Sequence, residues 1–169
     1  GVDNVSNLID LGFDTLIMST GPETWRRVLK EGFFNFTNWA KGSEQALMTS
    51  APRIAITNNI PLILWGENPG LQVGDMKTLG KNGYDGNNLR YMNTLSGGNL
   101  GWLYDSGFSH EELINFRYPS LQEFEEKNIQ IIYLGWFWKD WSIINNGMYS
   151  LMNGLQIRDD NVKNTGDIG

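Results

Sequence analysis

An apolar run that ends directly in a polar loop constrains the fold of this chain more than any other segment. The run is Pro61–Trp65, PLILW, and the loop that follows it is Gly66–Gly70, GENPG. A continuous apolar run of this length predicts a strand covered on both faces, as in a parallel sheet. Ligands of open α/β sheets bind just outside the carboxyl ends of the strands, so this loop lies where a binding site is expected. On spacing alone, an ordinary turn after a core strand is an equally good interpretation.

Two further segments have the composition of strands, Phe13–Ser19 and Ile129–Leu134. Segments with a helical pattern separate the three predicted strands. They are Pro22–Asn35, Glu44–Asn58 with Ser43 as its N-cap, Pro119–Asn128, and an aromatic helix over Trp136–Leu151 that would pack back on the sheet. This alternation predicts an α/β fold, with a parallel sheet flanked by helices.

Residues 66–107 form a long, polar, glycine-rich segment. Loops of this length inside a compact domain are usually functional or mobile. Asp75 and the segment around it are therefore candidates for a lid that shields a bound substrate from water. Ser96–Asn99, SGGN, has the composition of a phosphate loop, but it follows a helix-like stretch rather than a strand, and no Lys comes after it. We therefore expect an ordinary turn there.

Composition excludes several classes of function. The 169 residues suit one domain, and the net charge of −6 without a basic run argues against nucleic-acid binding. With no Cys and one His, thiolate catalysis, Cys-type zinc sites, His-based metal sites and a Ser-His-Asp triad are all improbable. No apolar run approaches the roughly 20 residues of a membrane span. We expect a cytoplasmic protein with neither a nucleic-acid partner nor a membrane span.

Polar side chains that could carry chemistry lie on both sides of the Pro61 strand. Glu67, Asn68 and Asp75 follow it, and carboxylates here could hold Mg²⁺ that bridges to a phosphate, or could position a nucleophile. Solvated loop charges are the alternative. Lys41 and Glu44 precede the strand, between two predicted helices. Lys41 could contact a phosphate or a carboxylate, although a surface ion pair with Glu44 is the simpler interpretation.

Several tryptophans follow the third predicted strand, Trp136, Trp138 and Trp141 among them. Such a group usually belongs to a core, but indole rings also stack on sugars and bases. The group therefore leaves open a second class of function, a noncatalytic carbohydrate-binding or scaffold module. Burial of these three rings against the sheet would remove the main support for that alternative.

Four separated blocks carry a family resemblance. They are Asn7–Ile17, Asn38–Leu47, Ile60–Pro69, and the end of the third predicted strand with the aromatic segment after it. With these blocks the chain resembles the N-acetyl sugar amidotransferase family of lipopolysaccharide and O-antigen biosynthesis, which looks like a branch of the PP-loop ATP pyrophosphatases. The most specific block contains WGENP, Trp65–Pro69.

The resemblance implies a Rossmann-like fold of the adenine nucleotide alpha hydrolase type and a transferase that uses ATP and Mg²⁺. The amide oxygen of a nucleotide-linked N-acetyl sugar would be activated as an adenylate. Ammonia from separate glutaminase and ammonia-channel proteins would then displace AMP and leave an amidine. A different PP-loop pyrophosphatase with another substrate is a further alternative. The resemblance assigns no catalytic base and no protein metal ligands. The expected substrate or nucleotide contacts are Trp65, Gly66, Glu67, Asn68, Lys41, Glu44 and Asp75.

The phosphate-binding loop of that family, a Ser-Gly-Gly-x-Asp-Ser type sequence on the first strand, does not occur in these 169 residues. We therefore expect residues 1–169 to be a single partial α/β domain, the C-terminal part of a PP-loop type domain that lacks its N-terminal strands. A partner could fill the gap left in the sheet, and a homo-oligomer is one such arrangement. We predict that this chain alone does not catalyse the reaction.

Overall fold

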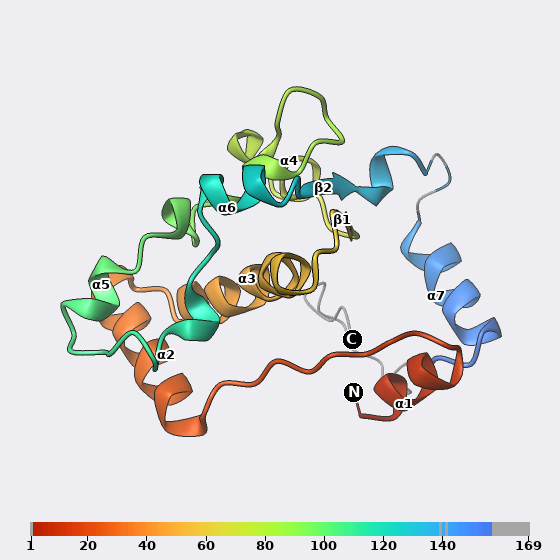
Figure 1. The fold of residues 1–169 in the computed structure, drawn as a ribbon. Helices are drawn as coiled ribbons and strands as arrows, with labels where there is room; N and C mark the ends of the chain where they lie inside the picture. The colour runs from red at the N-terminus through yellow and green to blue at the C-terminus, as the bar shows by residue number, and fades with distance from the viewer. Residues whose placement is uncertain (1, 139, 141, 157–169) are drawn as a thin grey trace. The chain divides into compact units, whose positions relative to one another are not determined.

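The computed structural model describes residues 2–138, 140 and 142–156, and the chain forms two compact units (Figure 1). One unit combines the two ends of the chain, Gly1–Ile17 and Lys139–Gly169, and the other is Met18–Trp138. The two described strands lie in the Met18–Trp138 unit, and so do the expected contact residues, from Lys41 to Asp75.

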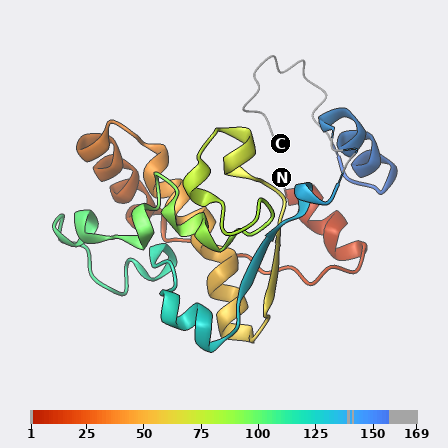
Figure 2. The ribbon, with the colours of Figure 1, turned by 90° about the horizontal axis from the view of Figure 1, so that it is seen from above.

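The sheet of the Met18–Trp138 unit has two parallel strands, β1 (Leu62–Trp65) and β2 (Gln130–Tyr133). The register places Ile63 opposite Ile131 and Trp65 opposite Tyr133, so both strands end at the same edge. Figure 2 shows the two strands side by side. The predicted combination of helices with a parallel sheet is confirmed.

Helices of different lengths flank this pair of strands. The longer ones are α2 (Pro22–Phe36), α3 (Ala40–Asn58) and α6 (Leu121–Glu126). Short helical turns connect them: α4 (Pro69–Gln72), η1 (Met76–Thr78), η2 (Asn87–Tyr91), η3 (Ser96–Gly98), α5 (Gly101–Tyr104), η4 (Ile114–Phe116) and η5 (Leu134–Trp136). The glycine-rich segment is thus a series of short helical turns.

That segment also contributes to the hydrophobic core. Leu89, Met92 and Leu95 are buried and pack with α3 and the sheet. Only Leu89 lies within η2, whereas Met92 follows its end and Leu95 precedes η3, so the turns between them bring all three to the core. A second buried cluster, around Val28 and Phe116, joins α2 to the later part of the segment. Burial of this kind explains how a polar, glycine-rich sequence can fold into the body of the unit.

The prediction that β1 is covered on both faces is wrong. Ile63 is buried against the core that α3 shares, whereas Leu64, on the opposite face, is 59% exposed. Successive side chains of a strand point to opposite faces, and here α3 packs on only one of them. An apolar run shows which residues can be buried, but the positions of the neighbouring helices determine which faces are covered.

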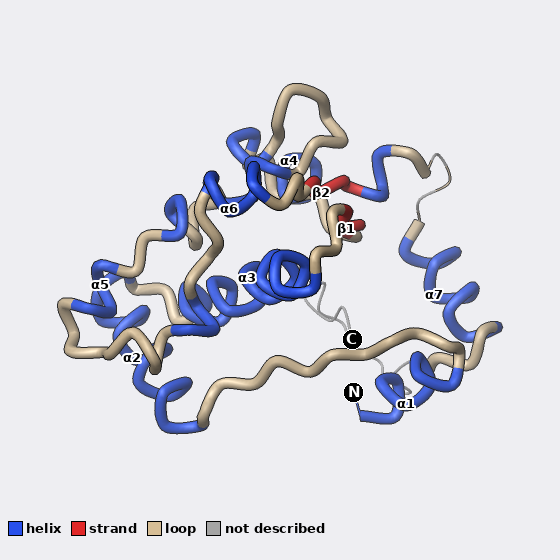
Figure 3. Tube along the Cα trace, in the orientation of Figure 1, coloured by secondary structure: helices blue, strands red, loops and turns tan. Residues whose placement is uncertain are grey.

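The predicted strand Phe13–Ser19 is also not formed. This stretch is chain without regular structure between α1 (Val2–Asp10) and α2, drawn as loop in Figure 3. The backbone amides of residues 14–17 donate no hydrogen bond within the described part of the chain. Phe13 and Ile17 are exposed. Strand propensity expresses a fit to neighbouring strands, and no described strand pairs with this one.

The start of α6 lies within two residues of the predicted one, whereas the start of α3 differs from the prediction. Helix α6 begins as expected, because Ser120 and Glu123 form a capping box. Ser43, predicted as an N-cap, instead lies inside α3 and donates to the carbonyl of Ala40 at 2.9 Å. The N-cap of α3 is Trp39, which makes no side-chain cap hydrogen bond; the Asn38 side chain accepts from the amide of Ala40, the first residue of the helix, at 2.9 Å. Pro52 lies inside α3 without ending it.

The aromatic helix predicted over Trp136–Leu151 begins later. Trp136 ends η5, and the helix α7 runs over Ile143–Met152 with Ser142 as its N-cap. A short polar side chain that accepts from the amide of Asn145, at 3.1 Å, is the stronger start signal. Trp141 lies outside the described residues.

The other unit contains α1 (Val2–Asp10) and α7. The side chain of Asn4 joins the two ends of the chain, since it donates to the carbonyl of Gln156 at 2.9 Å and accepts from its amide at 2.7 Å. Across the described residues, no helix is both long enough and apolar enough to cross a lipid bilayer.

Candidate functional site

The loop after β1 presents one exposed carboxylate beside one buried amide. Trp65 is half-buried against the core, and Gly66 and Glu67 are exposed. Asn68 is buried, and its backbone carbonyl accepts the first hydrogen bond of α4, from Gln72 at 2.9 Å. The change from strand to helix therefore holds Asn68 in place and leaves Glu67 open to solvent at the carboxyl end of the strand.

Gly83 contacts one residue from the segment after each strand. Its carbonyl accepts a hydrogen bond from the Asn68 side chain at 3.3 Å. Its Cα lies so close to the Trp136 ring that a Cβ there would overlap the ring. Asn68 follows β1 and Trp136 follows β2, so the Gly83 loop crosses the carboxyl edge of the sheet. Only glycine allows the ring to approach the backbone this closely.

The segment Tyr84–Asn87 pairs with the second edge of β2. Tyr133 donates from its amide to the carbonyl of Tyr84 at 2.8 Å, and Gly86 donates to the carbonyl of Ile131 at 2.9 Å. An isolated antiparallel bridge joins the same segment to β2. The loop that was predicted as a lid is therefore hydrogen-bonded to the sheet at this point.

Asp75 lies near the carboxyl end of β2. The hydroxyl of Tyr133, which is fully buried, donates to the carbonyl of Thr78 at 3.0 Å. Burial raises the pKa of Tyr133 to about 12, and the nearby carboxylates of Asp85 and Asp75 also raise it. Asp75 thus influences the buried hydroxyl of Tyr133 on β2, and its role as a contact residue stays a prediction. The sequence analysis did not single out Tyr133 and Asp85 as residues of this part of the structure.

Lys41 is not a surface residue. It is only 5% exposed, and its Nζ donates to the carbonyl of Thr94 at 3.0 Å and to the hydroxyl of Ser96 at 3.2 Å. Burial lowers its pKa. Within the described residues, no ion pair or hydrogen bond joins Lys41 to Glu44 or Glu67. The surface ion-pair interpretation is therefore wrong, and Glu44, which is half-buried, makes no side-chain hydrogen bond there.

The described residues do not fit a metal ion held by protein ligands. They contain no group of three or more His, Cys, Asp or Glu side chains close enough to hold one. The two strand-end loops, residues 66–70 and 134–138, contain no Lys or Arg to neutralise a triphosphate. We therefore assign no metal contact and no phosphate contact to this edge of the sheet.

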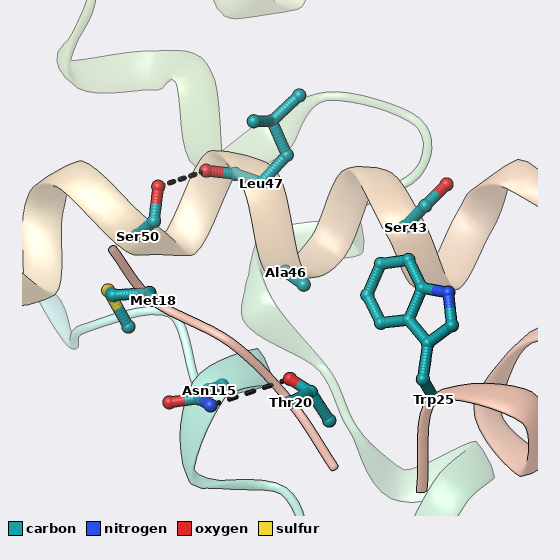
Figure 4. A pocket seen from close by; sticks show the side chains of 8 residues that line it. All are labelled: Met18, Thr20, Trp25, Ser43, Ala46, Leu47, Ser50 and Asn115. Atoms are coloured by element: carbon teal, nitrogen blue, oxygen red, sulfur yellow. Dashed lines mark hydrogen bonds between the residues drawn. The ribbon is translucent and has the colours of Figure 1, made fainter. Parts of the chain in front are cut away.

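A separate small pocket lies beside α3. It has a volume of about 230 Å³ and combines the Trp25 indole with the hydroxyls of Ser43 and Ser50 (Figure 4). On the opposite side of the pocket, Asn115 donates to the hydroxyl of Thr20 at 3.4 Å. This volume is below that of ordinary ligand pockets, about 300–1,000 Å³, so we assign no ligand to it.

The tryptophans after β2 are not buried against the sheet. Trp136 is 50% exposed and Trp138 is 48% exposed. The carbohydrate-binding alternative therefore keeps its main supporting feature.

The comparisons with known proteins are negative. No protein-family model matches the chain, and no curated protein matches it. The family resemblance of its sequence blocks therefore stays a prediction.

Proposed function

We propose that the chain is part of an ATP-dependent N-acetyl sugar amidotransferase of lipopolysaccharide or O-antigen biosynthesis, with a Rossmann-like fold of the PP-loop type. The observation that carries this proposal is the placement of Glu67 and Asn68 at the carboxyl end of a parallel strand. Asp75 lies near the end of the neighbouring strand. Open α/β sheets bind their ligands at this edge. The WGENP block, the most specific part of the resemblance, forms the same loop.

The reaction needs activation because an amide carbonyl is a poor electrophile. The amide oxygen of the sugar attacks the α-phosphorus of ATP, and pyrophosphate leaves. Ammonia then attacks the activated carbon, and AMP leaves with the former amide oxygen, so that an amidine remains. Ammonia would come from glutaminase and ammonia-channel partners, and the reaction would take place in the cytoplasm.

The chain's own residues would bind and orient the sugar in this scheme. Glu67 is exposed and makes no hydrogen bond within the described chain, so its carboxylate is available to accept from a sugar hydroxyl. Asn68 is held by Gly83 and sets the position of the loop. Trp65 supplies an apolar wall. A positioned carboxylate of this kind acts through orientation, which is a large part of catalysis.

The test is an assay on the proposed amidotransferase that contains residues 1–169. It is incubated with Mg²⁺-ATP, ammonia and UDP-N-acetylglucosamine as the probe sugar. We expect AMP, pyrophosphate and a sugar in which NH replaces the amide oxygen, detected by mass spectrometry. Glu67→Gln should lower kcat/KM by about tenfold or more, because an orienting contact is lost.

Glu125→Gln is the matched control, since Glu125 is an exposed carboxylate on α6, away from the strand ends. It should leave the rate unchanged. Absence of any amidine product with this and other nucleotide-linked N-acetyl sugars would contradict the proposal. So would an equal effect of the two substitutions.

A noncatalytic carbohydrate-binding module is the second candidate, because Trp136 and Trp138 are half exposed. It predicts that the 169-residue chain binds free N-acetyl sugars without ATP. Tryptophan fluorescence would then change on titration, and Trp136→Ala would remove the binding. Binding that requires ATP would instead favour the amidotransferase.

A further inference from the structure

Two buried cationic side chains donate hydrogen bonds to the turn Ser96–Gly98, called here the SGG turn. Lys41 donates to the hydroxyl of Ser96 at 3.2 Å, and Arg90 Nη2 donates to the carbonyl of Gly97 at 3.3 Å. Lys41 is 5% exposed and Arg90 is 8% exposed. Neither forms an ion pair with a carboxylate in the described part of the chain. Lys41 lies over the Phe36 ring at 4.6 Å and Arg90 over the Tyr118 ring at 5.6 Å, so aromatic faces offset part of the cost of burying a charge without a carboxylate.

Two donors at this turn have no acceptor. Arg90 Nη1 is buried without a hydrogen-bond partner. The amide of Gly97 donates to no described residue either. Positive φ angles at Ser96 (50°), Gly97 (74°) and Gly98 (88°) take the backbone out of the helical pattern that would use this amide. Buried polar groups are nearly always paired, so the buried, unpaired Nη1 of Arg90 points to a missing acceptor near this turn. Gly97 is half-buried, so its amide is accessible to a ligand.

The SGG turn forms one wall of an open pocket. The pocket has a volume of about 590 Å³, and its lining residues are Lys77, Tyr91, Met92, Asn93, Ser96 and Gly97. None of them is acidic, although the whole chain carries a net charge of −6. Lys77 is exposed and makes no ion pair with any described residue. Asp75, the nearest carboxylate along the chain, does not line this pocket.

We propose that this pocket binds a phosphoryl oxyanion, either a phosphate or a diphosphate group. The Lys77 ammonium, the Tyr91 hydroxyl and the Gly97 amide would donate to its oxygens. Lys41 and Arg90 stand behind the turn and add positive potential. Oxyanions with several acceptor oxygens pair well with such donors, and charge-assisted hydrogen bonds are the stronger ones. The proposal uses no residue of the strand-end loop, so it does not rest on the proposed function.

The sequence favoured an ordinary turn here because no Lys follows SGGN. The structure supplies the cations from elsewhere, Lys41 from α3 and Lys77 from η1. This arrangement differs from a phosphate loop between a strand and a helix, in which the cation belongs to the loop itself.

The test is an NMR titration of the ¹⁵N-labelled 169-residue chain with inorganic phosphate and with pyrophosphate, at constant ionic strength. We expect saturable amide shifts centred on Gly97. Lys77→Gln should weaken the affinity by about tenfold, because one charge-assisted hydrogen bond is lost. Lys81→Gln removes the same charge from an exposed site outside the pocket and should leave the affinity within about twofold, since distant exposed charges are screened.

Comparing inorganic phosphate with pyrophosphate distinguishes the two possible ligands, a single phosphate group and a diphosphate group. Tighter binding of pyrophosphate assigns the pocket to a diphosphate, and equal binding assigns it to a single phosphate. Shifts that do not saturate at millimolar anion would overturn the proposal, and so would equal losses in Lys77→Gln and Lys81→Gln. Glu67→Gln should leave the titration unchanged, so failure here is distinct from failure of the proposed function. Both lysines are exposed, so the variants are expected to fold.

Discussion

The side chain of Asn87 makes hydrogen bonds to the backbone at Ile131 and Ile129 that a neighbouring strand would otherwise make. Its Oδ1 accepts a hydrogen bond from the Ile131 amide at 2.8 Å, and its Nδ2 donates to the carbonyl of Ile129 at 3.5 Å. Together with the amide of Gly86, this side chain covers the edge of β2 that β1 leaves open. In this sheet of two strands, β2 thereby has hydrogen-bond partners on both of its edges.

Asn87→Ala should destabilise the Met18–Trp138 unit by about 1–3 kcal/mol, because the buried amide of Ile131 loses its acceptor. Chemical denaturation would measure the change. Asn87→Asp keeps an acceptor oxygen and should cost less. Asn35→Ala, at an exposed position of α2, serves as the control and should cost well under half as much. Equal costs for Asn87→Ala and Asn35→Ala would show that the pairing contributes nothing.

Gly83→Ala should displace the Trp136 ring, because a Cβ at this position overlaps it. Trp136 is half exposed and can move outward, so we expect a loss of only about 1–2 kcal/mol and a shift in tryptophan fluorescence. Gly66→Ala is the matched control, since a Cβ at Gly66 meets nothing within 4 Å. An unchanged emission spectrum in Gly83→Ala would contradict the close packing of ring and backbone.

The two faces of β1 should respond differently to truncation. Ile63→Ala removes a buried side chain and should cost about 2–4 kcal/mol of unfolding free energy. Leu64→Ala removes one that is largely exposed and should cost less than about 1 kcal/mol. Urea denaturation of the two variants measures both. A cost for Leu64→Ala as large as that for Ile63→Ala would mean that a partner covers this face in solution.

Glu123 should make the fold sensitive to acid. Burial favours its neutral form, but hydrogen bonds from Arg117 and Ser120 outweigh this and lower the pKa to about 2. A lowered pKa means that the carboxylate stabilises the fold above its usual value of 4.5, and that this stabilisation is lost as the pH falls from there toward 2. Because Arg117 is half exposed, we expect a contribution of about 1–2 kcal/mol.

Denaturation between neutral pH and pH 2 would measure this contribution. Glu123→Gln retains a capping-box acceptor for the amide of Ser120 but no longer titrates. Its stability should therefore fall less steeply with acid than that of the unaltered chain. Glu125→Gln should follow the unaltered chain. Parallel curves for Glu123→Gln and the unaltered chain would refute the assignment.

The sequence by itself determined the local features whose cause lies in neighbouring residues. The apolar runs at Leu62–Trp65 and Gln130–Tyr133 became the two strands, and the Ser120 and Glu123 pair capped its helix. The polar loop after β1 also lies where the sequence placed it, at the carboxyl end of a parallel strand. These features need only short-range preferences, which can be read from residue order.

Tertiary structure alone decided which segments acquired partners. Phe13–Ser19 has a strand-like sequence but no strand beside it, whereas the polar segment Tyr84–Asn87 lies along β2 and pairs with it. Lys41 looks like a surface lysine in the sequence, yet packing buries it beneath a turn more than fifty residues away along the chain. Pairing and burial depend on contacts between distant residues, and local sequence does not specify which distant residues meet.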